Sequence, residues 1–344
     1  MRQKQIGVIV LACSIAAVLL GSTAFAADRL PAAKAGAIGQ PKGKIAFVRD
    51  KNIWTMDASG GQQMRICEAG NADGRLSWAP DGKRIAFTRS GSVDLKGPDN
   101  LGGYHKVYDL FVAFVDSAMN HNTTFWYRIT DGVGSRDPEW SADGKTIIYY
   151  KDVNANFVNA FLPNYQICTL NSPENGTEEI LRRDWQNMTE FFIAPTMNAA
   201  GDIVFVHMVK GTQGSFRQQG MAKMSKTNFM TPLSEVGRQS AKMADLVAPA
   251  WSPDGKWIAC IGNNMSEPGV HIVSADFSEK YLVFNPPPAT SLYTIAPSFS
   301  PDSKWLTFST RDGSVWICDI MGNGAKRLTG PGMDSSPAWS KVAQ

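Results

Sequence analysis

Three of the four histidines in the sequence, His105, His207 and His271, could together bind a divalent metal ion. Imidazole nitrogen is a common ligand for such ions, and the amide oxygen of Gln218 or Gln219 could complete the coordination. His207 ends one apolar run typical of a strand, and His271 lies at the start of another. An isolated histidine at a strand end can equally be a polar group satisfied by its neighbours, so the metal site and this structural interpretation both stay open.

A second set of side chains combines aromatic rings with arginine and aspartate. Such a combination is typical of protein-protein interfaces, and it can also stack on a saccharide or bind a carboxylate. The candidate binding residues are Tyr104, Arg136, Asp137, Trp185, Arg217, Arg238 and Tyr293. They come from separate segments, so only the fold can bring them together.

The sequence lacks the motifs of several common enzyme classes. It contains no Gly-x-Ser-x-Gly, no His-Glu-x-x-His and no glycine-rich phosphate loop. The aspartates of its many Asp-Gly pairs are explained by turn geometry, so we assign no catalytic residue. With 34 Lys and Arg against 31 Asp and Glu and no basic block, nothing indicates nucleic-acid binding.

A repeated segment must position these residues. The segment Pro249 to Ile258, Pro-Ala-Trp-Ser-Pro-Asp-Gly-Lys-Trp-Ile, has close copies that begin at Pro138 and Pro297. Six copies in all are anchored at positions 78, 140, 197, 251, 299 and 339. Pro followed by Asp-Gly favours a tight turn between two short strands. Repeats with the spacing of these anchors are typical of a β-propeller, and we expect four strands in each unit.

The two ends of the chain are predicted to complete one unit. Residues Pro337 to Ser340 form an inner strand with nothing after it, and Lys44 to Val48 form a second strand that lacks an inner partner. Pairing them would remove the last exposed strand edges. We therefore predict an all-β, six-bladed propeller of four-stranded antiparallel blades, closed by the C-terminal strand joining the N-terminal blade.

The N-terminus has the pattern of a signal peptide at residues 1–26, with a basic start, an apolar run and the small residues Ala24-Phe25-Ala26. Cleavage there predicts a periplasmic or secreted protein that has no membrane span. Lipidation at Cys13, or retention of the run as an anchor, are the alternatives. Residues 27–43 lack periodicity and are predicted to be a flexible leader, which makes residues 44–344 the propeller.

Four cysteines remain after cleavage: Cys67, Cys168, Cys260 and Cys318. Each lies in an apolar strand pattern in a different blade, whereas a disulfide needs Cα atoms within about 7 Å. We expect buried free thiols.

The longest loops are expected on one face of the ring. Loops between second and third strands share a face with the connections between blades, and three consecutive blades have long ones at 90–106, 151–164 and 209–220. Insertions on one face of a repeat protein commonly build a binding surface, although surface loops also tolerate drift.

The repeat resembles that of the TolB-type propellers. Trp-Ser-Pro-Asp-Gly-Lys, a following Ile-Ala-Phe, a strand that ends in Asp and the segment Arg-Leu-Thr carry the resemblance over residues 44 to 340. It implies a six-bladed periplasmic propeller that binds proteins. The α/β domain that precedes the propeller in TolB has no match in residues 28 to 43. Related repeats occur in oligogalacturonate lyases and in prolyl-oligopeptidase-type peptidases, whose hydrolase domain is missing here.

We therefore predict an exported, non-catalytic scaffold that binds a protein or peptide partner in the cell envelope through the face with the long loops, without a cofactor. An oligosaccharide is a further candidate ligand. The alternative is a metal-assisted oligosaccharide or polysaccharide lyase that uses the three histidines as ligands. A third interpretation is a structural subunit of a larger envelope assembly.

Overall fold

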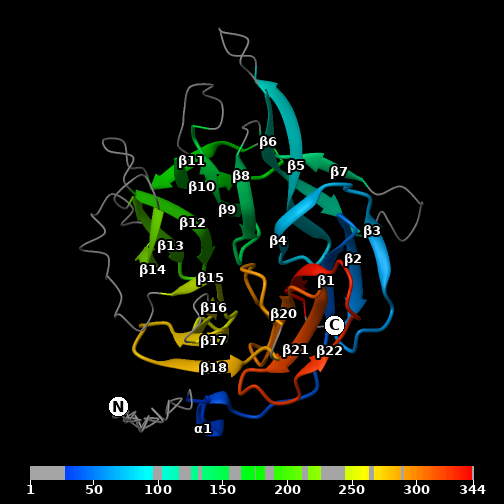
Figure 1. Cartoon of the computed structure of the whole chain (residues 1–344), viewed down its shortest axis with the longest axis vertical. Coiled ribbons are helices and arrows are strands. Elements are labelled where there is room, and N and C mark those ends of the chain that lie inside the picture. The colour runs from blue at the N-terminus through cyan, green and yellow to red at the C-terminus, as the bar shows by residue number, and fades with distance from the viewer. Residues whose placement is uncertain are drawn as a thin grey trace, which may run out of the picture.

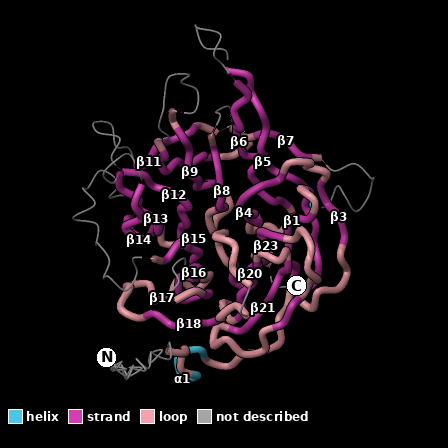
Figure 2. Tube along the Cα trace, viewed as in Figure 1, coloured by secondary structure: helices cyan, strands magenta, loops and turns pink. Residues whose placement is uncertain are grey.

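In the computed structural model, the described residues are 28–95, 103–115, 125–130, 134–154, 164–174, 176–182, 190–210, 216–225, 245–262, 267–287 and 290–342. Apart from the short helix α1 (Ala32–Ala35), their regular elements are strands, which form six antiparallel sheets around a central axis (Figures 1 and 2). This arrangement is the six-bladed β-propeller that the repeats predict.

Each sheet is one blade, and the blades are numbered here around the ring from the one that contains β1. From the axis outwards, blade 1 consists of β23 (Ser335–Trp339), β1 (Lys44–Arg49), β2 (Asn52–Asp57) and β3 (Met64–Cys67). Blade 2 consists of β4 (Ala72–Trp78), β5 (Arg84–Leu95), β6 (Gly103–Phe114) and β7 (Trp126–Arg128). Blade 3 consists of β8 (Ser135–Trp140), β9 (Thr146–Asp152), β10 (Tyr165–Asn171) and β11 (Glu178–Arg182). Blade 4 consists, within the described residues, of β12 (Glu190–Met197), β13 (Asp202–Lys210) and β14 (Phe216–Ser225). Blade 5 consists of β15 (Leu246–Trp251), β16 (Trp257–Gly262), β17 (Gly269–Ser274) and β18 (Lys280–Phe284). Blade 6 consists of β19 (Ser298–Phe299), β20 (Trp305–Thr310), β21 (Ser314–Asp319) and β22 (Lys326–Arg327).

The ring closes as predicted, because β23 from the C-terminus pairs with β1. Ile45 lies opposite Trp339 in this antiparallel ladder, and Ala46 lies opposite Ala338. In Figure 1 the last strands of the chain lie beside the first ones. β1 is thereby paired on both sides, with β23 and β2, so it offers no free edge for pairing with other chains.

The Ser-Pro-Asp-Gly segments form the predicted tight turns between first and second strands. In blade 5, Ser252 Oγ donates to Asp254 Oδ1 at 2.6 Å and accepts the main-chain N–H of Trp257 at 2.9 Å. The N–H of Gly255 donates to the Ser252 carbonyl at 2.9 Å, and its φ of 70° is readily adopted by glycine. We call the face of the ring that carries these turns the turn face, and the opposite face the loop face.

Neighbouring inner strands are joined by a recurring hydrogen bond. In three blades the residue before the repeat's anchor carries a hydroxyl, which accepts the main-chain N–H of the anchor in the following blade. The three bonds run from Trp140 to Ser77 Oγ (3.0 Å), from Trp251 to Thr196 Oγ1 (3.2 Å) and from Trp339 to Ser298 Oγ (2.9 Å). Each hydroxyl therefore helps to hold the next blade at a defined position around the axis.

Two of the predicted long loops are partly regular hairpins. Strands β5 and β6 stay paired as far as Leu95 and Gly103, so much of the segment 90–106 extends blade 2 outward (Figure 1). Strands β13 and β14 likewise pair as far as Lys210 and Phe216. The prediction of loops there was wrong in this respect, because alternating side chains let the ladder continue beyond the ring.

The segment 27–43, predicted to be a flexible leader, is docked on the ring from residue 28 onward. Leu30 and Ala35 are buried against blades 5 and 6, and the carbonyl of Ala35 accepts a hydrogen bond from Lys304 in a turn of blade 6. The indole N–H groups of Trp305 and Trp339 donate to the carbonyls of Gly39 and Lys42 at 3.0 and 2.8 Å. Composition alone did not predict this path, because its partners belong to blades that are distant in the sequence.

The four cysteines among the described residues are buried, and no disulfide links them. Burial raises the pKa of the Cys67 thiol to about 12 and also raises the pKa of Cys260 and Cys318. The prediction of buried free thiols is confirmed.

Within the described part of the chain, no helix is long and apolar enough to cross a membrane. The predicted signal peptide at residues 1–26 and the alternative lipidation site Cys13 lie outside the described residues.

Candidate functional site

The candidate binding residues are described to different extents. Trp185 and Arg238 lie outside the described residues. Tyr104 and Arg217 are placed as strand positions only, opposite Asp94 in blade 2 and Val209 in blade 4. Arg136, Asp137 and Tyr293 are described with their side chains, and their surroundings decide what they can do.

Arg136 lies at the loop-face end of the inner strand β8, where it packs against tyrosines from two blades. Its guanidinium carbon is 3.2 Å from the ring centroid of Tyr108, a cation-π contact. Tyr150 and Tyr165 flank it, and their rings contact each other edge to face at 5.5 Å. Burial opposes the charge, but the surrounding tyrosines outweigh this effect, so the pKa of Arg136 lies above its ordinary value.

The aromatic cluster around Arg136 continues into the next blade, since the ring of Tyr165 contacts that of the buried Phe191 at 5.8 Å. Within the described part of the chain, no carboxylate forms an ion pair with Arg136. Arg136 is thus a half-buried cation that lies over the ring of Tyr108 and has no anionic partner among the described residues.

Asp137, the residue after Arg136, has a structural role. Its Oδ1 accepts the main-chain N–H of Arg75 at 2.9 Å, and its own N–H donates to Thr88 Oγ1 at 3.0 Å. Its φ of 51° is uncommon for a residue other than glycine, and the two bonds to blade 2 hold it there. Asp137 therefore joins blades 2 and 3.

Tyr293 lies on the connection to blade 6, on the opposite side of the ring from blade 3. Its main-chain N–H donates to the Ser309 carbonyl at 3.2 Å, and its ring centroid is 5.9 Å from the guanidinium carbon of Arg311. The described candidates therefore form two separate groups and not one site.

Two of the three candidate metal ligands make contacts within their own blades. His207 is buried in blade 4, where its ring stacks on Phe192 at 5.7 Å and Nε2 lies 3.5 Å from Glu190 Oε2. His271 is buried in blade 5 with Nε2 at 3.2 Å from the Glu267 carbonyl, and burial lowers its pKa. No group of three or more possible ligands is found among the described residues. The side chain of His105 is not described, so a site built from all three histidines stays a prediction.

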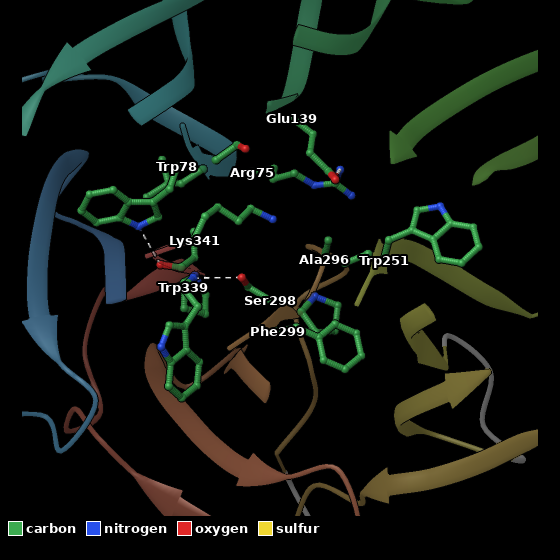
Figure 3. Close-up of a pocket in the computed structure, with 15 residues that line it drawn as sticks. Arg75, Trp78, Glu139, Trp251, Ala296, Ser298, Phe299, Trp339 and Lys341 are labelled. Atoms are coloured by element: carbon green, nitrogen blue, oxygen red, sulfur yellow. Dashed lines mark hydrogen bonds and ion pairs between the residues drawn. The ribbon is translucent and has the colours of Figure 1, made fainter. Parts of the chain in front are cut away.

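The central channel holds a functional group that the sequence analysis missed. The buried side chain of Arg75, from β4 of blade 2, crosses to three other blades (Figure 3). It pairs with Glu139 Oε2 of blade 3 at 2.8 Å and donates to the carbonyls of Pro195 and Pro249 in blades 4 and 5 at 2.8 and 2.7 Å. Glu139 Oε1 accepts a further hydrogen bond from Thr196 Oγ1 at 2.9 Å. The sequence signal for Arg75 was a departure from the repeat. The other copies have proline two residues before the anchor, whereas the Trp78 copy has leucine there, within Gly-Arg-Leu.

The channel is narrow at the level of Arg75 and widens toward the turn face. The space beside Arg75 is about 30 Å³, enough for about one water molecule. A larger chamber of about 190 Å³ adjoins it and opens between the turns of blades 3, 4 and 5. Glu139, Trp251 and Lys341 line both spaces, and Figure 3 shows Lys341 pointing into the ring of inner strands.

The geometry defines a class of protein, a closed six-bladed β-propeller with an aromatic cluster on the loop face and a channel bridged by arginine. No protein-family profile and no curated protein sequence matches the chain. Among solved structures, the chain is similar to TolB from Acinetobacter baumannii, with a TM-score of 0.64 and 18% identity over 90% of this chain and 69% of that one. It is also similar to a putative TolB from Agrobacterium tumefaciens, with a TM-score of 0.52 and 16% identity over 85% of this chain and 90% of that one. An oligogalacturonate lyase in complex with manganese has a TM-score of 0.46 and 13% identity over 84% of this chain and 74% of that one. The fold is therefore that of a TolB-like propeller, as the repeat predicts.

Proposed function

We propose that this chain is an exported, non-catalytic scaffold that binds a protein or peptide partner in the cell envelope through its loop face. The TolB-like fold and the signal-peptide pattern of residues 1–26 support this proposal. The observation that carries it is the state of Arg136, a preorganised cation without a described carboxylate partner.

The position of Arg136 suits a binding contact. Its guanidinium is planar and carries five donors, which match a carboxylate in two parallel hydrogen bonds. Stacking on Tyr108 already limits its rotamers, so binding would cost little further side-chain entropy. Arginine beside tyrosines, partly removed from water, is the composition of interface residues that contribute most to affinity. An acidic side chain of the partner is the group that fits this position.

The contacts in the channel support a role as a scaffold. Glu139 is the carboxylate that lines the two described spaces of the channel, and both of its oxygens accept hydrogen bonds, from Arg75 and Thr196. Glu139 is thus engaged in holding blades 2, 3 and 4 together. The arginine bridge links four of the six blades and stabilises the ring that presents the loop face.

The proposal is tested by affinity capture from the cell envelope, followed by mass spectrometry. We expect one or more proteins to be recovered by the native chain and reduced about tenfold by Arg136→Gln, because such a substitution at a central interface residue typically costs more than 1 kcal/mol.

The matched control is Arg327→Gln. Arg327 also stacks on an aromatic ring, with its guanidinium carbon 5.0 Å from the centroid of Trp316, but it already pairs with Asp312 at 3.1 Å. Equal recovery of every captured protein by the native chain and both variants would refute binding at Arg136.

A further inference from the structure

The chamber of about 190 Å³ opens on the turn face, whereas Arg136 lies on the loop face. The chamber has no role in the proposed function. Its lining consists of Pro80, Glu139, Trp140, Ser141, Ala142, Met197, Asn198, Ala199, Trp251, Ser252, Pro253 and Lys341. Its volume of about 190 Å³ exceeds the roughly 150 Å³ of an engineered protein cavity that binds benzene. The chamber is therefore large enough for one side chain of the size of leucine or phenylalanine.

The wall of the chamber combines apolar side chains with polar atoms of the turns. Most of its lining side chains are tryptophan, methionine, proline or alanine, and the serine and asparagine side chains are engaged in their own turns. Ser141 Oγ and Ser252 Oγ each donate to the aspartate of their turn at 2.6 Å, and Asn198 Oδ1 accepts two main-chain N–H groups at 3.0 and 2.9 Å. An apolar side chain that enters the chamber would lie against the lining of Trp140, Met197 and Trp251 and lose part of its contact with water.

Two charged side chains line the chamber, Glu139 and Lys341. Arg75 neutralises Glu139 by a buried ion pair, so the ammonium group of Lys341 remains as an additional charge. Lys341 is exposed, and it forms no hydrogen bond or ion pair with another described residue. A cation at the edge of an apolar chamber favours an anionic ligand, because the low-dielectric walls strengthen the attraction.

The arginine bridge closes the inner end of the chamber. Arg75 spans from blade 2 to carbonyls of blades 4 and 5, and the space beside it holds about one water molecule. A polypeptide that enters from the turn face therefore cannot continue through the channel. A chain end fits this geometry better than the middle of a chain.

From these observations we infer that the turn-face chamber binds the C-terminal residue of a peptide. The apolar side chain of that residue occupies the chamber between Trp140 and Trp251, and its free α-carboxylate pairs with Lys341. This inference does not rest on the proposed function, because no residue of the chamber belongs to the cluster around Arg136.

The experiment compares two probes that differ only in charge, N-acetyl-L-leucine and its primary amide. Binding is followed by NMR of methionine methyl groups labelled with carbon-13, and the Met197 signal is assigned with Met197→Leu. We expect both probes to shift this signal, with the acid binding about fivefold more tightly than the amide, as for a partly exposed ion pair. In Lys341→Met the affinity for the acid is expected to fall to that for the amide.

Two further variants make the outcome specific. Lys256→Met removes an exposed lysine of the blade 5 turn that does not line the chamber, and it should retain the preference for the acid. Ala199→Trp adds a ring at an exposed turn position and should abolish binding of both probes by filling the chamber.

Equal affinity for acid and amide in the native chain would overturn the inference. So would a response that survives Ala199→Trp, or the absence of any Met197 response at about 10 mM probe, a weak-binding limit.

Discussion

Removing the side chain of Arg75 should destabilise the ring strongly. The side chains of Arg75 and Glu139 are only 7% and 11% exposed, so Arg75→Met would leave a buried carboxylate without its counter-ion. Breaking a buried pair from one side typically costs about 3 to 5 kcal/mol. The carbonyls of Pro195 and Pro249 would lose their donor as well. We expect a loss within this range in the free energy of unfolding, measured by urea denaturation with tryptophan fluorescence and circular dichroism.

The double variant Arg75→Met with Glu139→Met separates the charge from the packing. It removes both ions, and the remaining cost is that of the hydrogen bonds lost by two carbonyls and Thr196, about 1 kcal/mol each. The double variant should therefore be more stable than Arg75→Met alone by up to about 2 kcal/mol. If it is equally or less stable, the argument from an uncompensated carboxylate is refuted.

Arg89→Met is the matched control for loss of an arginine near the ring. Arg89 is half-buried, donates to the Ala69 carbonyl at 2.9 Å and lies over the ring of Trp126 at 5.3 Å. No described carboxylate would be left without a partner. We expect a loss of about 1 kcal/mol.

Three further predictions concern single groups. Because burial raises the pKa of Cys67 to about 12, its thiol should resist alkylation at pH 8 in the native protein and react in urea, and rapid native labelling would contradict its buried position. Hydrogen bonds from Ser274 and Ser278 lower the pKa of Asp276 to about 2, so the stability from this carboxylate is fully present above its ordinary pKa of about 3.9 and is lost as the pH falls toward 2. In Ser278→Ala a carbon-13 titration of Asp276 should show a higher midpoint, and an unchanged one would disprove the role of the hydroxyl. Purified protein should contain no stoichiometric manganese, zinc or calcium, and stoichiometric metal that is lost in His207→Ala would instead favour the lyase alternative.

The repeat made the fold predictable because each of its signals is local. In Ser252 to Gly255, the serine, aspartate and glycine form their turn with hydrogen bonds to near neighbours, and alternating apolar residues define the flanking strands. The count of six anchors and the unpaired strands at both ends then predicted a closed ring, which the pairing of Ile45 with Trp339 confirms. Burial of the cysteines followed from the same alternation.

The candidate sites were less predictable, because they depend on where separate blades place their side chains. Arg136 was recognised as a possible binding residue, but its contact with Tyr108 joins two blades and has no counterpart in sequence spacing. Asp137 matched the expected composition, yet its carboxylate is engaged by the main chain of Arg75. Composition indicates which groups are present and does not indicate which of them are already paired.

The sequence by itself determined the blade count, the turns and the closure, since turn chemistry and strand alternation act over a few residues and are simply repeated. Only the tertiary structure decided that Arg75 bridges the channel, that residues 28–43 dock on blades 5, 6 and 1 and that Lys341 borders a chamber on the turn face. These features use carbonyls, indole N–H groups and cavities supplied by blades far apart in the chain. Their energies depend on distance and burial, which exist only once the ring has closed.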